Sequence, residues 1–206
     1  MIDISMDLDE NTVVWVDDEK PKLVPIARKP KAPVNFTWLN FSAHAGTHID
    51  APYYLFEHKW KSNEVPLNIL NGDCQVIDLT NITDMITKKD LEKKKILSKR
   101  VLLKTKNSFD NLKEYNPKHI SLSVDGAEYL RDLKIELVGF DYQSFEREGK
   151  TEIHSIFMKN NIICLDNLRL GKTSEKIYTL LCLPIKVIGI DAAPARAILL
   201  EDKNEF

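Results

Sequence analysis

Glycine and cysteine are scarce in this chain of 206 residues, and charge of neither sign is in clear excess. The seven glycines are scattered singly, which argues against a glycine-rich loop that cradles nucleotide phosphates. Lys and Arg total 29 against 31 Asp and Glu, so the net charge of -2 provides no overall field to hold nucleic acid or an anionic membrane. We therefore expect a small-molecule partner, with neither nucleic acid nor membrane as a binding surface.

The three cysteines, Cys74, Cys164 and Cys182, are odd in number and form no CxxC pair. This argues against a disulfide framework or a cysteine-based zinc site and favours a reducing compartment. The acidic N-terminus lacks the basic and then apolar pattern of an export signal. The most apolar stretch, 178–200, is interrupted by prolines and charged residues that a membrane-spanning helix would not carry. We therefore expect a cytoplasmic protein.

Length and composition predict one globular domain, residues 1–206, of mixed α and β structure. Periodicity and turn residues predict helices after the capping-box spacing of Thr87 and Asp90, from Ser123 to about Leu133, and over 154–160. They predict strands over 34–43, 74–79, 100–104, 135–140, 162–165, 178–183, 186–190 and 197–201. The stretch 20–33, rich in Pro and Lys, is predicted to be a loop that forms a lid or an intersubunit arm.

The most informative run is HAGTHIDAP at 44–52, which places two imidazoles and a carboxylate within seven residues. Glycine, β-branched residues and proline disfavour a helix here, and in an extended chain His44, His48 and Asp50 point to one side. Four extended residues span roughly 13 Å, so we predict a bend at Gly46 that brings the histidines together. Two imidazoles and one carboxylate suit Zn(II) with an open position for water, and oxygen-rich surroundings also admit Mn(II). The alternative is a pair of buried, hydrogen-bonded histidines with Asp50 as a turn cap.

This run resembles the signature of the cyclase family of metal-dependent hydrolases, which contains bacterial kynurenine formamidases and isatin hydrolases. The resemblance covers nearly the whole chain and continues at 66–67, 101–105, 139–141 with Ser144, His154, 165–168 and 193–197. It implies a compact α/β domain with a central mixed β-sheet or barrel-like core flanked by helices. It also implies one or two divalent ions and assembly into homodimers or homotetramers.

Matching positions of the family imply five metal ligands: His44, His48, Asp50, His154 and Asp166. Asp166 stands where the family has a longer glutamate, so one ion is more secure than two. Trp15 matches an aromatic position that packs on substrate, with a place in the core as the alternative.

Tyr54 stands where the family has a histidine that shuttles protons, and His58, four residues further on, is a second candidate for that task. Charged neighbours of His58 favour an exposed position as the alternative. His119, in an Asn-Pro-Lys-His run, is predicted to lie on a loop surface.

The leading hypothesis is a metal-dependent hydrolase that cleaves a carbon–nitrogen amide bond with metal-activated water. An aryl formamide such as N-formylkynurenine, or a cyclic amide such as isatin, is the expected substrate. The alternative is a metal-retaining protein that binds a small ligand and has lost hydrolysis because Tyr54 replaces the shuttle histidine.

Overall fold

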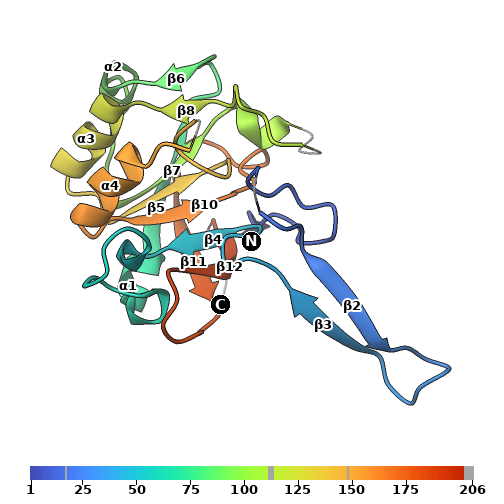
Figure 1. Cartoon of the computed structure of the whole chain (residues 1–206). Coiled ribbons are helices and arrows are strands. Elements are labelled where there is room, and N and C mark those ends of the chain that lie inside the picture. Colours follow the sequence, from blue (N-terminus) through green and yellow to red (C-terminus); the bar gives the residue numbers. More distant parts are fainter. Residues whose placement is uncertain (17, 111–113, 148, 202–206) are drawn as a thin grey trace.

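A computed structural model describes residues 1–16, 18–110, 114–147 and 149–201 (Figure 1). Its main sheet has the strand order β1-β12-β11-β5-β7-β9-β10-β4, and an additional pairing between β12 and β4 closes the ring, leaving β1 at its edge. The strands are β1 (Ile2–Asp3), β4 (His48–Asp50), β5 (Asn71–Asp78), β7 (Arg100–Lys104), β9 (Leu137–Phe140), β10 (Ile163–Asp166), β11 (Ile177–Pro184) and β12 (Ala192–Leu200). The expected α/β fold with a barrel-like mixed β core is confirmed.

The sheet contains three parallel pairs, β5–β7, β7–β9 and β9–β10. Antiparallel pairs join β11 to β5 and β12, and β4 to β10 and β12. Strands β9 and β10 are buried throughout, as expected of parallel strands covered on both faces, which explains their mainly apolar sequences. In β7, Val101 and Leu103 join the cluster that packs against the helices, whereas Leu102 points into the barrel. The barrel interior is tight at Gly139, because a Cβ there would lie 2.7 Å from Cδ1 of Leu168 and closer still to Leu102.

Helices α2 (Lys88–Glu92), α3 (Val124–Asp132) and α4 (Glu152–Lys159) gather on one side of the barrel (Figure 1). The predicted caps are present: Asp90 accepts from the Thr87 amide and hydroxyl, and Ser123 accepts from the Gly126 amide. The remaining short elements are η1 (Pro52–Tyr54), η2 (Ser62–Glu64), α1 (Leu67–Leu70), β6 (Met85–Ile86), η3 (Lys106–Phe109) and β8 (Ser121–Leu122). Among the helices of the described residues, none has the length and apolar character that a membrane span requires.

Two sequence-based predictions of chain segments are wrong. The stretch 20–33 is not all loop, because β2 (Lys22–Ala27) pairs antiparallel with β3 (Phe36–Asn40). These strands form a hairpin, here called the arm, that projects from the barrel (Figure 1). Residues 186–190 are not a strand, because β11 ends at Pro184 and the chain must turn before β12. Val187 and Ile188 of that turn are exposed, so the apolar composition does not reflect burial in a sheet.

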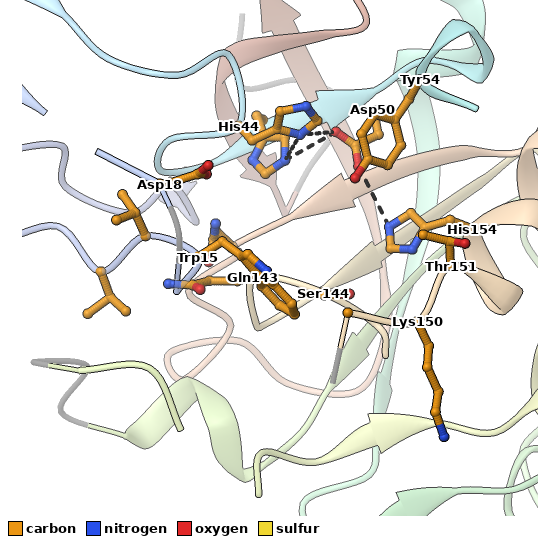
Figure 2. A pocket seen from close by; sticks show the side chains of 15 residues that line it. Trp15, Asp18, His44, Asp50, Tyr54, Gln143, Ser144, Lys150, Thr151 and His154 are labelled. Carbon is orange, nitrogen blue, oxygen red and sulfur yellow. Dashed lines mark hydrogen bonds and ion pairs between the residues drawn. The ribbon is translucent and has the colours of Figure 1, made fainter. Parts of the chain in front are cut away.

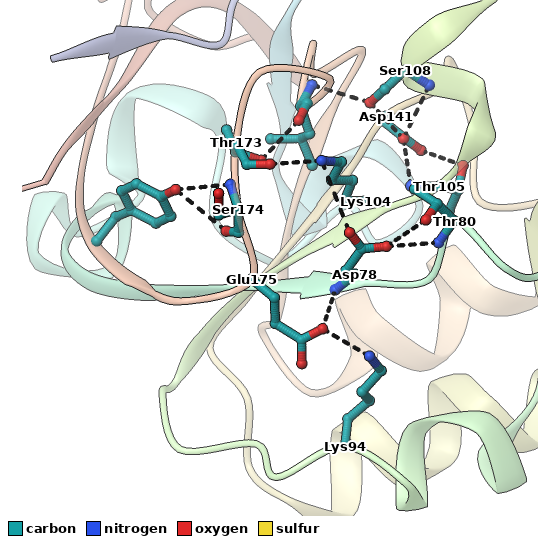
Figure 3. Close-up of polar contacts among 12 residues, drawn as sticks. Asp78, Thr80, Lys94, Lys104, Thr105, Ser108, Asp141, Thr173, Ser174 and Glu175 are labelled. Atoms are coloured by element: carbon teal, nitrogen blue, oxygen red, sulfur yellow. Dashed lines mark hydrogen bonds and ion pairs between the residues drawn. The ribbon is translucent and has the colours of Figure 1, made fainter.

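A buried polar network fixes the conformation of the chain that follows β7 (Figure 3). Asp141 accepts hydrogen bonds from the amide and hydroxyl of Thr105, at 2.6 and 2.8 Å, and from those of Ser108, at 3.2 and 2.7 Å. Burial nevertheless raises the pKa of this carboxyl group. Both carboxylate oxygens of Asp141 thus hold the turn that follows β7.

Candidate metal centre

The centre is built on a turn that enters β4. Gly46 has a φ of +66°, a conformation that glycine adopts without strain, and the chain reverses there before the strand begins at His48. The predicted bend at Gly46 is confirmed, but the expectation of one extended segment is wrong, because His44 lies in the turn rather than in a strand. The bend is what allows the two imidazoles to meet.

Three ligand atoms converge within the run predicted from the sequence. Nδ1 of His44 lies 3.3 Å from Nε2 of His48 and 2.9 Å from Oδ1 of Asp50, and the same oxygen is 3.2 Å from Nε2 of His48. His48 and Asp50 are buried and His44 is partly exposed. We call these three residues the first triplet.

A second triplet, formed by Asp50, His154 and Asp166, shares the Asp50 carboxylate. Figure 2 shows Asp50 facing His154. Nε2 of His154 lies 3.6 Å from Oδ2 of Asp50 and 3.8 Å from Oδ2 of Asp166. Asp166 ends β10, and His154 is the third residue of α4. In each triplet one ligand atom per residue lies within 4.8 Å of the others. The structure therefore brings together all five residues that the family resemblance singled out.

The donor set fits a divalent cation. Both carboxylate oxygens of Asp166 are buried and accept no hydrogen bond from the described residues. Leaving such lone pairs without a partner is costly, because a buried charge needs compensation. A doubly charged ion supplies it, and these oxygen and imidazole donors are the types that Zn(II) and Mn(II) accept.

The carboxylate charges of this cluster shift the pKa values of its histidines and of Asp166. Burial by itself would lower the pKa of His44 and His154, but the neighbouring carboxylates outweigh it and raise each to about 10. Burial, with the Asp50 charge, raises the pKa of Asp166 to about 6 in spite of His154. The cluster thus attracts positive charge, and cation binding must displace protons from the imidazoles.

Each of the three histidines has a fixed partner on its outer nitrogen. Nε2 of His44 lies 2.9 Å from Oδ2 of Asp191, and Nδ1 of His48 lies 2.8 Å from the Gly46 carbonyl oxygen. Nδ1 of His154 contacts Oε2 of Glu146. In all three cases the other ring nitrogen faces the cluster, an arrangement typical of metal-binding histidines.

Asp191 and Glu146 were not predicted from the sequence. Asp191 is 147 residues from its histidine along the chain, and Glu146 lies in a charged stretch that looks like solvent-exposed loop. The nearest residues that resemble the family are 139–141 with Ser144, which precede Glu146, and 193–197, which follow Asp191. Neither stretch includes the carboxylate beside it.

A cavity of about 320 Å³ is lined by His44, His48, Asp50 and His154, whereas Asp166 is not among its lining residues. Trp15 lines one side, and its ring packs edge-on against Tyr115 with ring centroids 4.9 Å apart. Tyr54 lies over the histidines, with ring centroids 5.0 Å from His44 and 6.1 Å from His154. Burial and the surrounding carboxylates raise the pKa of Tyr54, so its phenol stays protonated and can donate a hydrogen bond.

The two remaining histidines lie outside this cavity. His58 is exposed and is not among the lining residues, so the structure does not bring it to the cluster. The prediction of a surface position for His119 is wrong: its side chain is 1% exposed and stacks on Tyr142 with ring centroids 4.0 Å apart. Burial lowers the pKa of His119 to about 4.

The amino-acid sequence matches the family described as "Putative cyclase" over residues 2–147. Cyclase-like protein 3 of Arabidopsis thaliana is 33% identical over 189 residues, which are 85% of this chain and 69% of that protein. Kynurenine formamidase of Bacillus cereus is 30% identical over 202 residues and covers 96% of each chain. The chain belongs to the cyclase family, and the resemblance seen in the sequence is confirmed.

Solved structures agree with this assignment. A structure described as a potential metal-dependent hydrolase with cyclase activity is 33% identical, with a TM-score of 0.85 over 96% of this chain and 95% of the other. An isatin hydrolase bound to the product analogue thioisatinate has a TM-score of 0.86 over 98% of this chain and 92% of its own, but at 20% identity it shows the fold alone. The prediction of a hydrolase enzyme is confirmed at this level of class.

Proposed function

We propose that this protein hydrolyses a carbon–nitrogen amide bond with the help of one or two divalent ions held by His44, His48, Asp50, His154 and Asp166. The observation that carries the proposal is the pair of triplets joined through Asp50, in which the buried carboxylate oxygens of Asp166 accept no hydrogen bond within the described residues. The first triplet, with two imidazoles, suits Zn(II), and the second, with two carboxylates, also admits Mn(II).

A cation bound there would acidify water and polarise the amide carbonyl. The protein's own groups then orient and stabilise the reacting atoms. Glu146 and Asp191 hold the imidazoles of His154 and His44 in place. The Tyr54 phenol, kept protonated by its surroundings, donates a hydrogen bond to the oxyanion that develops at the carbonyl.

The shape and lining of the cavity support a substrate of about one aromatic ring. Its volume of about 320 Å³ is near the lower end of the range for small-molecule sites. Val13, Val14 and Trp15 give one wall an apolar character, and the indole of Trp15 offers a surface for ring stacking. An aryl formamide such as N-formylkynurenine, or a cyclic amide such as isatin, has this size and carries an amide carbonyl for the cation. Relatives named kynurenine formamidase support the first of these.

The experiment that tests the proposal combines metal analysis with hydrolysis. We expect protein purified without chelator to contain a divalent ion and to hydrolyse members of a panel of aryl formamides and cyclic amides. His44→Ala should lose both properties. His58→Ala is the matched control, because it removes an exposed histidine outside the cavity. A His44→Ala protein with the ion content and activity of the parent would refute the proposal.

Tyr54 supports a second candidate function, a metal-retaining protein that binds a small ligand without hydrolysing it. Within the cavity lining, the histidines all belong to the triplets, so no further imidazole is placed to transfer protons. This candidate predicts that every metal-loaded form, Tyr54→His included, is inactive on the whole substrate panel while still binding an aryl amide.

We also propose that the chain assembles into a homodimer or homotetramer through the arm. Large apolar side chains of the arm are exposed, among them Phe36, Trp38 and Leu39. An isolated two-stranded hairpin is marginally stable in water, so a partner surface that covers it would stabilise it. Residues 20–40 carry five basic residues and no acidic one, whereas the rest of the chain has more acidic than basic residues. This charge difference favours docking of the arm on a second copy of the chain.

A further inference from the structure

Glu146 is buried, with 4% of its side chain exposed, and its two carboxylate oxygens have different partners. Oε2 contacts Nδ1 of His154. Oε1 accepts from the backbone amide of Ile153 and, at 3.4 Å, from that of His154. One carboxylate thus holds both the backbone and the ring of the same histidine.

The contact with the backbone replaces a missing helix cap. Thr151 precedes α4 but makes no side-chain hydrogen bond to the first turn. Ile153 and His154 are the second and third residues of that helix, whose amide groups an N-cap side chain normally satisfies. Glu146, which comes from the preceding loop, therefore caps α4 in place of Thr151 and fixes the position from which the His154 side chain projects.

The contact with the ring fixes the tautomer of the neutral imidazole, which is the form that binds an ion. An ionised carboxylate only accepts hydrogen bonds, so Nδ1 of His154 carries the proton that it donates to Glu146. Nε2 is then free to face Asp50 and Asp166 at 3.6 and 3.8 Å. The corresponding partner of His44, Asp191, differs because 38% of its side chain is exposed and it contacts that histidine through the ring.

We propose that Glu146 is a positioning residue that sets the ion affinity of the second triplet by holding His154 in one place and one tautomer. The inference rests on the proposed function, because the second triplet is taken to be a metal site. Partners of this kind alter metal affinity by about 10- to 100-fold. The affinity of the first triplet should be affected less, because His44 and His48 have other partners.

Glu146→Gln tests the inference, because glutamine has nearly the same shape but only one acceptor oxygen. If that oxygen caps the helix, the amide group faces Nδ1 of His154, and the ring must place its proton on Nε2, where the ion binds. We expect the variant to bind the ion of the second triplet at least about tenfold less tightly. In ion-free protein at a pH above about 10, where the ring of His154 is neutral, we expect its imidazole ¹⁵N signals to shift between tautomers. Glu152→Gln, in the exposed first turn of the same helix, should match the parent in both measurements.

A double variant separates the cap from the ring contact. Thr151→Asp supplies a capping side chain from the helix's own N-cap position. Added to Glu146→Gln, it should restore thermal stability without restoring ion affinity or the parent ¹⁵N signals. The inference is overturned if Glu146→Gln keeps the parent affinity and tautomer, or if the double variant regains ion affinity together with stability. A parent that binds no ion would refute the proposed function, and the ¹⁵N signals alone would then decide whether Glu146 positions His154.

Discussion

Asp166 lies directly opposite His48 across the β10–β4 pair, so two neighbouring strands of the barrel present one candidate ligand each at the same level. Asp50, two residues beyond His48, faces Cys164 in the same register and Ala192 on the other side. The strand β4 is short, yet it is hydrogen-bonded on both edges by β10 and β12. Closure of the barrel therefore fixes the carboxylates of both triplets on rigid elements.

Tyr54 gives the clearest prediction about catalysis. Tyr54→Phe removes the phenol donor and should lower the turnover rate by roughly 10²- to 10³-fold, as loss of an oxyanion donor does elsewhere. Tyr54→His introduces an imidazole, whose ordinary pKa near 6.5 suits proton transfer at neutral pH, and should raise turnover above that of the Phe variant. Steady-state kinetics on the most reactive amide of the panel measures both. Equal rates for the parent and the Phe variant would show that the phenol takes no part.

His119 predicts how stability depends on pH. Its folded-state pKa of about 4 lies below the ordinary value near 6.5, so the unfolded chain takes up a proton more readily. Stability from this residue is present above pH 6.5 and is lost as the pH falls toward 4, up to about 3 kcal/mol.

Urea unfolding of the parent and His119→Gln between pH 7 and pH 4 measures this loss. We expect the difference in unfolding free energy between the two proteins to shrink as the pH falls. His58→Gln, at an exposed histidine, is the control and should leave the pH dependence of the parent unchanged. Parallel curves for the parent and His119→Gln would contradict the assignment.

Gly139 predicts how tightly the barrel is packed beneath the site. Gly139→Ala adds a methyl group that meets Leu102 and Leu168 inside the barrel, and we expect a loss of roughly 1–3 kcal/mol of stability. In a Leu102→Ala background the same change should cost less, because the space is then available. A double-mutant cycle of unfolding free energies tests this coupling, and additive effects would mean that the two positions are not in contact.

Trp38 tests the proposed assembly. Its side chain is 63% exposed on the arm, and Trp38→Ser removes apolar surface without touching the barrel. We expect the variant to sediment as a smaller species than the parent at the same concentration. Leu97→Ser, at an equally exposed residue away from the arm, is the control. A parent that is already monomeric, or a variant that assembles as the parent does, would contradict the proposal.

The sequence was most informative where chemistry depends on neighbours along the chain. The limits of β7 and the capping box of Thr87 were predicted because local periodicity and hydrogen bonding determine them. The first triplet was predicted because its members lie within seven residues. His154 and Asp166 came only from the family resemblance.

What could not be predicted depends on contacts between distant segments. Glu146 and Asp191 acquire their roles only after folding places them beside His154 and His44. His119 has a polar local sequence, yet Tyr142 and its neighbours bury it. The apolar composition of residues 186–190 predicted a strand, but they form a turn in which Val187 and Ile188 are exposed. A strand and an exposed turn can share the same composition.

The ion content of Asp50→Asn tests the central claim most directly, because Asp50 belongs to both triplets. Asparagine keeps the size of the side chain but removes its charge. Elemental analysis after dialysis should find one or two equivalents of divalent ion in the parent and in His58→Ala, and almost none in Asp50→Asn. An Asp50→Asn protein that is folded and holds as much ion as the parent would contradict the account.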